Sequence, residues 1–149
     1  MFRNILVATD GSPMARRAIR LAVRLAREQK ARVTGFYAGP AWQPDMYAYG
    51  KDAPPGFITP GQHADQVRRT ADRHLAVVRK AAAAAGVPCQ CSYVEGVFPY
   101  VEIIKAAKRN RCDLIVMASH GRRGIARLLL GSQAAMVLAH STLPVLICR

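Results

Sequence analysis

The chain has 149 residues, of which 22 are Lys or Arg and nine are Asp or Glu, so its formal net charge is +13. Hydrophobic residues make up 51% of the chain and charged residues 21%, a composition that excludes a disordered polyelectrolyte. This length predicts a single domain, residues 1–149, with a core large enough to need no disulfide or metal.

No stretch of the sequence predicts membrane insertion or secretion. The apolar runs are far shorter than the ~18 residues of a membrane-spanning helix. The first of them, residues 5–8, is also shorter than the ~7–15 residues of a signal-peptide core, so we expect a cytoplasmic protein. The cysteines lack C-x-x-C spacing, and we expect core or half-buried thiols in a reducing compartment. They are Cys89, Cys91, Cys112 and Cys148.

The chain begins with a strand followed by a helix and a second strand. Residues 2–8 form an apolar run rich in β-formers, and Ser12 followed by Pro13 is typical of a helix start. Apolar residues in this helix recur at the spacing of a buried stripe, with arginines on the opposite side. A second strand is expected over residues 31–38. The stripe consists of Ala15, Ala18, Ile19, Ala22, Leu25 and Ala26, and the arginines are Arg16, Arg20, Arg24 and Arg27.

A long irregular segment, residues 39–61, follows the second strand. Segments of this length in compact domains are usually functional lids or flexible connections. Aromatic residues among its prolines favour a lid or a contact surface over a linker. The residues concerned are Pro40, Pro44, Pro54, Pro55 and Pro60 with Trp42, Tyr47, Tyr49 and Phe57.

The next part of the chain predicts a helix and a third strand. Helical spacing returns over residues 62–85, and Gly86 with Pro88 ends the helix. A strand is expected over residues 89–94, in which Cys89 and Cys91 share one face, and Glu95 with Gly96 is expected to form a turn. The predicted buried stripe of the helix is Ala64, Val67, Ala71, Leu75, Val78 and Ala82.

The remaining residues predict two further helices and strands. A helix begins at Pro99, and residues 113–118 form a strand that is apolar enough to be buried on both faces. A loop over residues 119–130 leads to a helix that opens with Gly131 and Ser132. The last strand begins at Pro144 and ends at Cys148. The predicted inner face of the helix from Pro99 is Val101, Ile104 and Ala107.

This alternation of short strands and helices predicts an α/β fold with a parallel sheet and helices on both faces. Ligands of such sheets bind outside the carboxyl ends of the strands, where the strand order reverses. The loops that follow the strands are therefore the places to look for a functional site.

The loop after the fourth strand is the strongest candidate. Backbone N–H groups of Gly131, Ser132 and Gln133 would point out of a helix amino terminus, where the dipole favours an anion. Gly121 and Gly124 allow the main chain to approach a polyphosphate closely. The alternative is a simple turn followed by an N-capped helix. Nearby positive charge comes from Arg122, Arg123 and Arg127.

Here the sequence resembles the universal stress protein family over nearly its whole length. ATP-binding members carry a G-x2-G-x9-G-[ST] motif, and Ala118, Gly121, Gly131 and Ser132 occupy its positions, with alanine in place of the first glycine. The resemblance implies a Rossmann-like open doubly wound sheet of five parallel strands in the order 3-2-1-4-5. The matching segments are residues 10–12, Gly96, residues 113–117, 119–121, 128–132 and 144–147.

The resemblance also implies a site for ATP or another adenine nucleotide at the carboxyl ends of the first and fourth strands. It places Asp10 at the adenosine end and Ala38 at the adenine wall. Separately, we expect Asp10 to assist Mg²⁺ if the nucleotide binds with this ion. The remaining residues would line the ribose and hold the phosphates. The full predicted set is Ala8, Thr9, Asp10, Ala38, Met117, Ala118, His120, Gly121, Arg122, Gly131, Ser132 and Gln133.

Several of these residues have structural alternatives. Asp10 could only shape its turn, although Ser12 and Pro13 already start the helix and leave the carboxylate for a ligand. Met117 is equally typical of a core, and His120 of a solvated loop. The other histidines lack metal-ligand spacing. They are His63, His74 and His140.

We expect a nucleotide-binding sensor with slow or no hydrolysis rather than an enzyme. Asp10 is the obvious carboxylate in the loops of the proposed site, whereas a hydrolase needs a base and an oriented nucleophile. An edge strand with free backbone groups favours pairing, and the family implies a homodimer through the strand from Pro144 to Cys148. A transferase or ligase of related fold would need a glycine-rich loop after the first strand, and this loop is too short to wrap a phosphate.

Binding of nucleic acid or another polyanion is the alternative function. Basic residues occur on three predicted helices, which we expect on different sides of the molecule, as in a solvated surface. No aromatic and basic motif for single strands accompanies them. Besides the arginines of the first helix, they are Arg68, Arg69, Arg73, Arg79, Lys80, Lys105, Lys108, Arg109 and Arg111.

Overall fold

The computed structural model describes residues 1–43, 58–120 and 130–149. Strands and helices alternate along the described chain. They are β1 (Asn4–Ala8), α1 (Pro13–Gln29), β2 (Arg32–Pro40), α2 (Pro60–Ala84), β3 (Cys89–Gly96), α3 (Pro99–Arg109), β4 (Leu114–Ala118), α4 (Ser132–His140) and β5 (Val145–Cys148).

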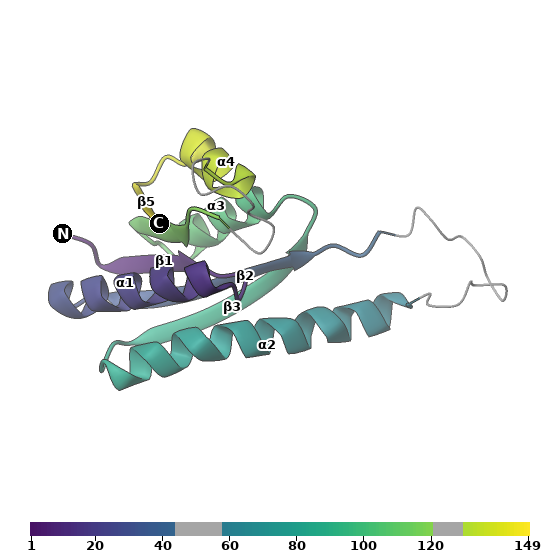
Figure 1. Ribbon diagram of the computed structural model, residues 1–149, viewed down its shortest axis with the longest axis horizontal. Helices are drawn as coiled ribbons and strands as arrows, with labels where there is room; N and C mark the ends of the chain where they lie inside the picture. The colour runs from purple at the N-terminus through teal and green to yellow at the C-terminus, as the bar shows by residue number, and fades with distance from the viewer. Residues whose placement is uncertain (44–57, 121–129) are drawn as a thin grey trace, which may run out of the picture.

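The strands form one parallel sheet in the order β3-β2-β1-β4-β5. Helices α1 and α2 cover one face of this sheet, and α3 and α4 cover the other (Figure 1). The predicted α/β class, the strand order and the Rossmann-like layering are confirmed. The chain leaves β1 toward β2 and leaves β4 toward β5, so the strand order reverses between β1 and β4.

The central position of β1 in the sheet explains why its sequence is apolar without alternation. Ile5 and Val7 pack into the cluster under α1 and α2, whereas Leu6 and Ala8 pack into the cluster under α3 and α4. All five residues of β1 are buried, because a parallel strand in the middle of such a sheet has no face in contact with water.

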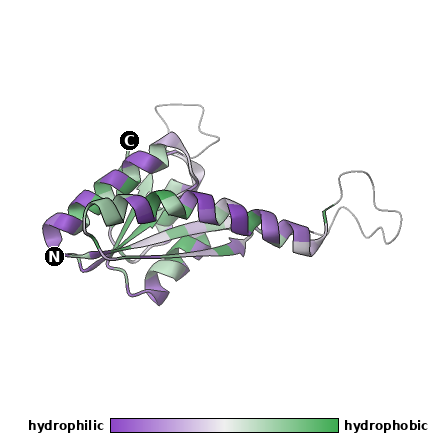
Figure 2. Cartoon of the chain, turned by 90° about the horizontal axis from the view of Figure 1, so that it is seen from below, coloured by the Kyte–Doolittle hydropathy of each residue, from purple (hydrophilic) through white to green (hydrophobic). Residues whose placement is uncertain are grey.

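Helix α1 begins as its sequence predicts. The Ser12 hydroxyl accepts a hydrogen bond from the Ala15 N–H at 3.1 Å, and Pro13 occupies the first helical position. The predicted stripe is buried apart from Leu25, which is half-buried, and Val23 joins it. The predicted outward arginines are all exposed, and Figure 2 shows hydrophilic residues on the outer surfaces of the helices.

The ends of β2 and β3 differ from the sequence predictions. β2 continues to Pro40 and β3 to Gly96, because the two strands stay paired through Gly39 opposite Glu95 and Pro40 opposite Gly96. The expected turn at Glu95 and Gly96 is therefore wrong, since pairing with β2 keeps both residues extended.

Helix α2 begins earlier than expected and buries a slightly different face. Thr59 and Gln62 form a reciprocal capping box that starts the helix at Pro60. Ala64 is exposed, contrary to the predicted stripe, because burial on α2 begins at Val67. His74 lies on the buried stripe instead.

The buried face of α3 also differs from the prediction. Ile103, Ala106 and Ala107 are buried, whereas Val101 and Ile104 are half-buried. Only Ala107 belongs to both sets. The helix is rotated so that residues at positions i, i+3 and i+4 from Ile103 face the sheet.

The predicted lid over residues 39–61 lies mostly outside the described residues. Gly39, Pro40, Pro60 and Gly61 belong to β2 and α2 rather than to a loop. Trp42 precedes the undescribed residues and Ile58 follows them. The Trp42 indole N–H donates to the Ile58 carbonyl at 3.4 Å. None of the described helices is both long enough and apolar enough to cross a membrane.

Candidate functional site

Three of the predicted site residues meet on the α3/α4 side of the sheet. Ala8 ends β1, Met117 and Ala118 end β4, and Ala38 lies near the end of β2. Ala8, Ala38 and Met117 contact the same hydrophobic cluster, whereas Ala118 packs toward the cluster under α1. The Met117 side chain is buried, which fits the core role rather than the ligand role among its two predicted roles.

The loop after β1 is fixed by its own polar side chains. The Thr9 N–H donates to the Phe36 carbonyl at 3.0 Å, which ties the loop to β2. The Gly11 N–H donates to the Thr9 hydroxyl at 3.2 Å, and the Ser12 N–H donates to the Asp10 Oδ1 at 3.0 Å. The Asp10 carboxylate therefore shapes its turn, as the structural alternative expected. A carboxylate offers further acceptor sites, so its role toward a ligand stays a prediction.

The end of β4 lies against the start of α4. The Gly131 N–H donates to the Ser119 carbonyl at 2.8 Å. A Cβ atom on Gly131 would lie 2.7 Å from that carbonyl oxygen and 3.4 Å from the His120 Cα. Only glycine therefore allows this approach, which places the amino terminus of α4 beside the switch point of the sheet.

The first turn of α4 has the features of an anion-binding helix end. Gly131 is the N-cap residue, with no side-chain capping bond in the described structure and no acidic residue in the first turn. Ser132 and Gln133 are exposed. The Gln133 Oε1 accepts a hydrogen bond from the Tyr100 N–H at 3.0 Å, so this side chain links α4 to α3.

His120 lies between these elements. Its Nδ1 is 3.1 Å from the hydroxyl of the buried Ser119. Its Nε2 is buried and meets no hydrogen-bond partner among the described residues. Such an atom costs about 1–3 kcal/mol when it stays unsatisfied. The predicted site residues Gly121 and Arg122 lie outside the described residues, as do Gly124, Arg123 and Arg127.

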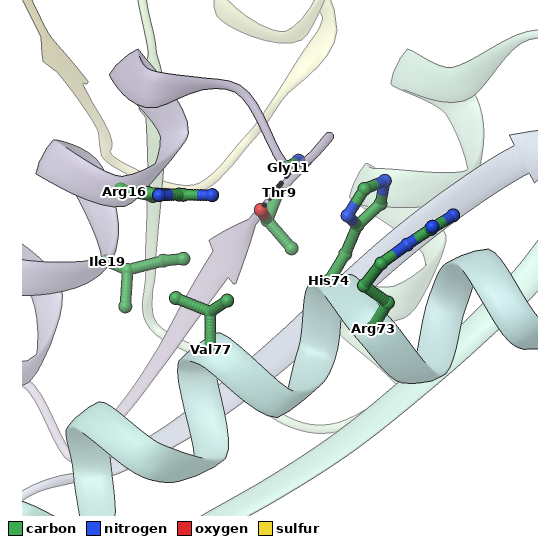
Figure 3. A pocket seen from close by; sticks show the side chains of 7 residues that line it. All are labelled: Thr9, Gly11, Arg16, Ile19, Arg73, His74 and Val77. Atoms are coloured by element: carbon green, nitrogen blue, oxygen red, sulfur yellow. Dashed lines mark hydrogen bonds between the residues drawn. The ribbon is translucent and has the colours of Figure 1, made fainter.

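A pocket of about 260 Å³ lies on the opposite side of the β1 loop, between α1 and α2. Among the predicted site residues that the structure describes, only Thr9 lines it. Arg16 from α1 and Arg73 with His74 from α2 surround it (Figure 3). The sequence reasoning missed His74, which is 7% exposed and meets the Tyr37 ring edge-on at 5.2 Å. The sequence signal that could have identified His74 is its spacing along α2, which places it on the buried stripe of that helix.

The paired cysteines of β3 share one face, as predicted, and are half-buried. Their sulfur atoms are 3.8 Å apart. The hydrogen bond from Cys89, with the Arg79 guanidinium nearby, lowers the pKa of Cys91 to about 7. The same hydrogen bond and burial raise the pKa of Cys89.

The histidines do not form a metal centre within the described chain. The His63 Nε2 lies 2.9 Å from the Pro40 carbonyl and 3.7 Å from the Glu95 carboxylate, and the Tyr100 and His140 rings stack with a tilt at 5.5 Å. The described residues contain no group of three or more His, Cys, Asp or Glu side chains placed to hold a metal ion.

The fold and the loops define an α/β protein with a candidate ligand site at the switch point between β1 and β4. The sequence model of the universal stress protein family matches residues 1–149, and the chain belongs to this family.

Individual relatives agree with this assignment. Universal stress protein YxiE of Bacillus subtilis is 33% identical over 154 aligned positions that cover 100% of both chains. The solved structure of MJ0577 from Methanocaldococcus jannaschii superposes with a TM-score of 0.81 at 22% identity, over 99% of this chain and 96% of that one. A universal stress protein solved in complex with cAMP superposes with a TM-score of 0.69 at 26% identity, over 99% and 97% of the two chains.

Proposed function

We propose that this protein binds ATP or another adenine nucleotide at the carboxyl ends of β1 and β4 and acts as a dimeric, cytoplasmic stress-response sensor. The observation that carries the proposal is the contact between Ser119 and Gly131. It holds the open amino terminus of α4 against the end of β4, the strand that pairs with β1. We therefore expect one ligand to reach both the α4 terminus and the loop after β1.

The phosphates are expected at α4. Backbone N–H groups and the dipole at a helix amino terminus favour an anion, and neither a side-chain cap nor an acidic residue of the described first turn competes with it. A ribose hydroxyl or a phosphate oxygen near His120 would provide the hydrogen-bond partner that its Nε2 lacks among the described residues. Gly121 and Arg122 would complete this end of the site.

The adenosine end is expected at the loop after β1. Ala8 and Ala38 supply a small apolar surface there, and the Asp10 turn is fixed by its bond from Ser12. The universal stress protein at 26% identity was solved in complex with cAMP, and this supports an adenine nucleotide as the ligand here. Ala118, in place of the first motif glycine, adds one methyl group at the ribose and phosphate edge of the site.

We expect hydrolysis to be slow or absent. Asp10 is the carboxylate among the proposed site residues, and its Oδ1 already accepts a hydrogen bond from the Ser12 N–H. A fast hydrolase needs a general base within reach of the attacking water. Because the phosphates are expected at α4, Asp10 would assist Mg²⁺ through the waters that this ion keeps in its coordination shell.

Titration calorimetry with ATP, ADP and AMP, with and without Mg²⁺, tests the proposal. The native protein should bind at millimolar or lower concentration. Ser132→Glu and Gly131→Glu should weaken ATP binding at least about 100-fold, because like charges placed together cost several kcal/mol. Ser132→Glu is the more informative change, since Ser132 is exposed and an acidic residue suits the first turn of a helix.

Gly61→Glu is the matched control. It adds a carboxylate to the first turn of α2, where a Cβ atom has room, with Thr59 Oγ1 at 3.9 Å as its nearest contact. ATP binding should stay at the native level. Absence of binding by the native protein, or equal binding by Ser132→Glu, would contradict the proposed site.

A polyanion-binding function is the second candidate. Helices α1 and α2 lie side by side on one face of the sheet (Figure 1), so the expectation that the basic helices occupy different sides is wrong for this pair. Exposed arginines on both helices, such as Arg20 and Arg69, therefore belong to one basic face.

A further inference from the structure

Cys89 and Cys91 lie far from the proposed nucleotide site. They occupy the first and third positions of β3, at the amino end of the sheet, whereas the nucleotide is expected at the carboxyl ends of β1 and β4. Both side chains pack against the cluster under α1 and α2. Their sulfur atoms lie 3.8 Å apart.

The backbone of β3 disfavours a disulfide between the two cysteines. Residues two apart in a strand are separated by about 6.6 Å along the chain, near the upper limit of about 6.8 Å for Cα atoms joined by a disulfide. Pairing with Val33 and Gly35 of β2 holds Cys89 and Cys91 in this extended register. We therefore expect two neighbouring thiols rather than a bond between them.

The separation of the sulfurs suits an ion that binds both of them. Two sulfurs that each lie about 2.3 Å from a tetrahedral ion are about 3.8 Å apart, as the Cys89 and Cys91 sulfurs are. Thiolates are the ligands that soft ions prefer.

Cys89 and Cys91 are both half-buried, so part of each side chain is open to solvent. Cys89 and Gln90 form part of a groove of about 500 Å³ at the amino end of β3, opposite Lys30 and Arg32. Gly35 accommodates the Cys91 sulfur, because a Cβ atom at Gly35 would lie 2.8 Å from that sulfur.

We propose that Cys89 and Cys91 form a bidentate site for a thiophilic metal or metalloid ion. Because the described residues supply no third ligand side chain, the other coordination positions belong to solvent or to a small external ligand. An organic arsenoxide reacts with such a pair by forming two As–S bonds, and its oxygen leaves as water with the two thiol protons. No electron transfer is needed.

Phenylarsine oxide is the probe for this site. Protein reduced with a phosphine should bind one equivalent, with a mass increase of one phenylarsine oxide less one water. Cys89→Ser and Cys91→Ser should each bind at least about 100-fold more weakly, because a single sulfur loses the effective concentration of the second. Cys148→Ser is the matched control, since Cys148 is also half-buried, and it should bind like the native protein.

A second measurement needs no variant. Bound phenylarsine oxide should protect Cys89 and Cys91 from alkylation, as read by peptide mass mapping, and leave Cys148 reactive. Full binding by either single-serine variant, loss of binding in Cys148→Ser, or unchanged alkylation of the pair would each overturn the proposal.

Discussion

Gly11 determines how the loop after β1 rests on α2. Its φ angle is +78°, a conformation that L side chains rarely adopt, and a Cβ atom there would collide with the His74 ring. Gly86 has a similar φ of +66° but no atom within 4 Å of such a Cβ. Comparing a substitution at Gly11 with the same substitution at Gly86 therefore distinguishes the cost of backbone strain from the cost of a collision with a neighbouring side chain.

We expect Gly11→Ala to lower the free energy of unfolding by more than Gly86→Ala does. The positive φ costs about 1–2 kcal/mol at either position, and overpacking against His74 adds about 1–3 kcal/mol at Gly11 alone. Urea denaturation measures both losses. In a His74→Ala background the excess at Gly11 should disappear, because the ring that causes it is gone. Equal losses at both glycines in the native background would contradict this explanation.

At the level of elements, β5 is an edge strand whose outer side has no pairing strand within the described chain. The carbonyls of Pro144 and Cys148 accept hydrogen bonds from Ile115 and Ser119 near β4. Since backbone groups alternate in direction along a strand, those of Val145 and Ile147 point away from β4. They are available to the second copy of the chain in the proposed homodimer.

Ile147→Pro should shift the proposed dimer to monomer. Proline removes the outward N–H of Ile147 and cannot donate to a partner strand, while the bonds between β4 and β5 are kept. Sedimentation velocity measures the change, and Ile147→Val is the control that keeps the donor and should remain dimeric. A native protein that sediments as a monomer, or a proline variant that stays dimeric, would rule out this interface.

The whole molecule carries a charge of +13, and its arrangement bears on the alternative function. If the basic face of α1 and α2 binds duplex DNA, fluorescence anisotropy should show an affinity that falls about 10³-fold or more between 50 and 200 mM salt, as six or more phosphate contacts predict. Replacing Arg20 and Arg24 with Gln should weaken this binding. The same change at Lys105 and Lys108 on α3, on the other face, should leave it unchanged. An affinity that does not depend on salt would contradict phosphate binding.

Two predictions that depend on neighbouring residues were confirmed. The Ser12–Pro13 start of α1 and the continuous burial of β1 follow from side-chain capping and hydrophobic spacing, which act over a few residues. The strand order was available only through resemblance to the family. The predicted face of α3 was wrong because Val101 and Ile103 have similar hydrophobicity, and packing against the sheet selected Ile103.

The sequence by itself determined the alternation of strands and helices, the buried character of β1 and β4, and the segments that follow each strand. Tertiary structure alone decided that Gly11 meets His74, that Ser119 touches Gly131, and that the basic faces of α1 and α2 lie together. The reason is physical. Spacing and capping are local properties of the chain, whereas these contacts join residues that are distant in sequence and meet only once the order of the strands is fixed.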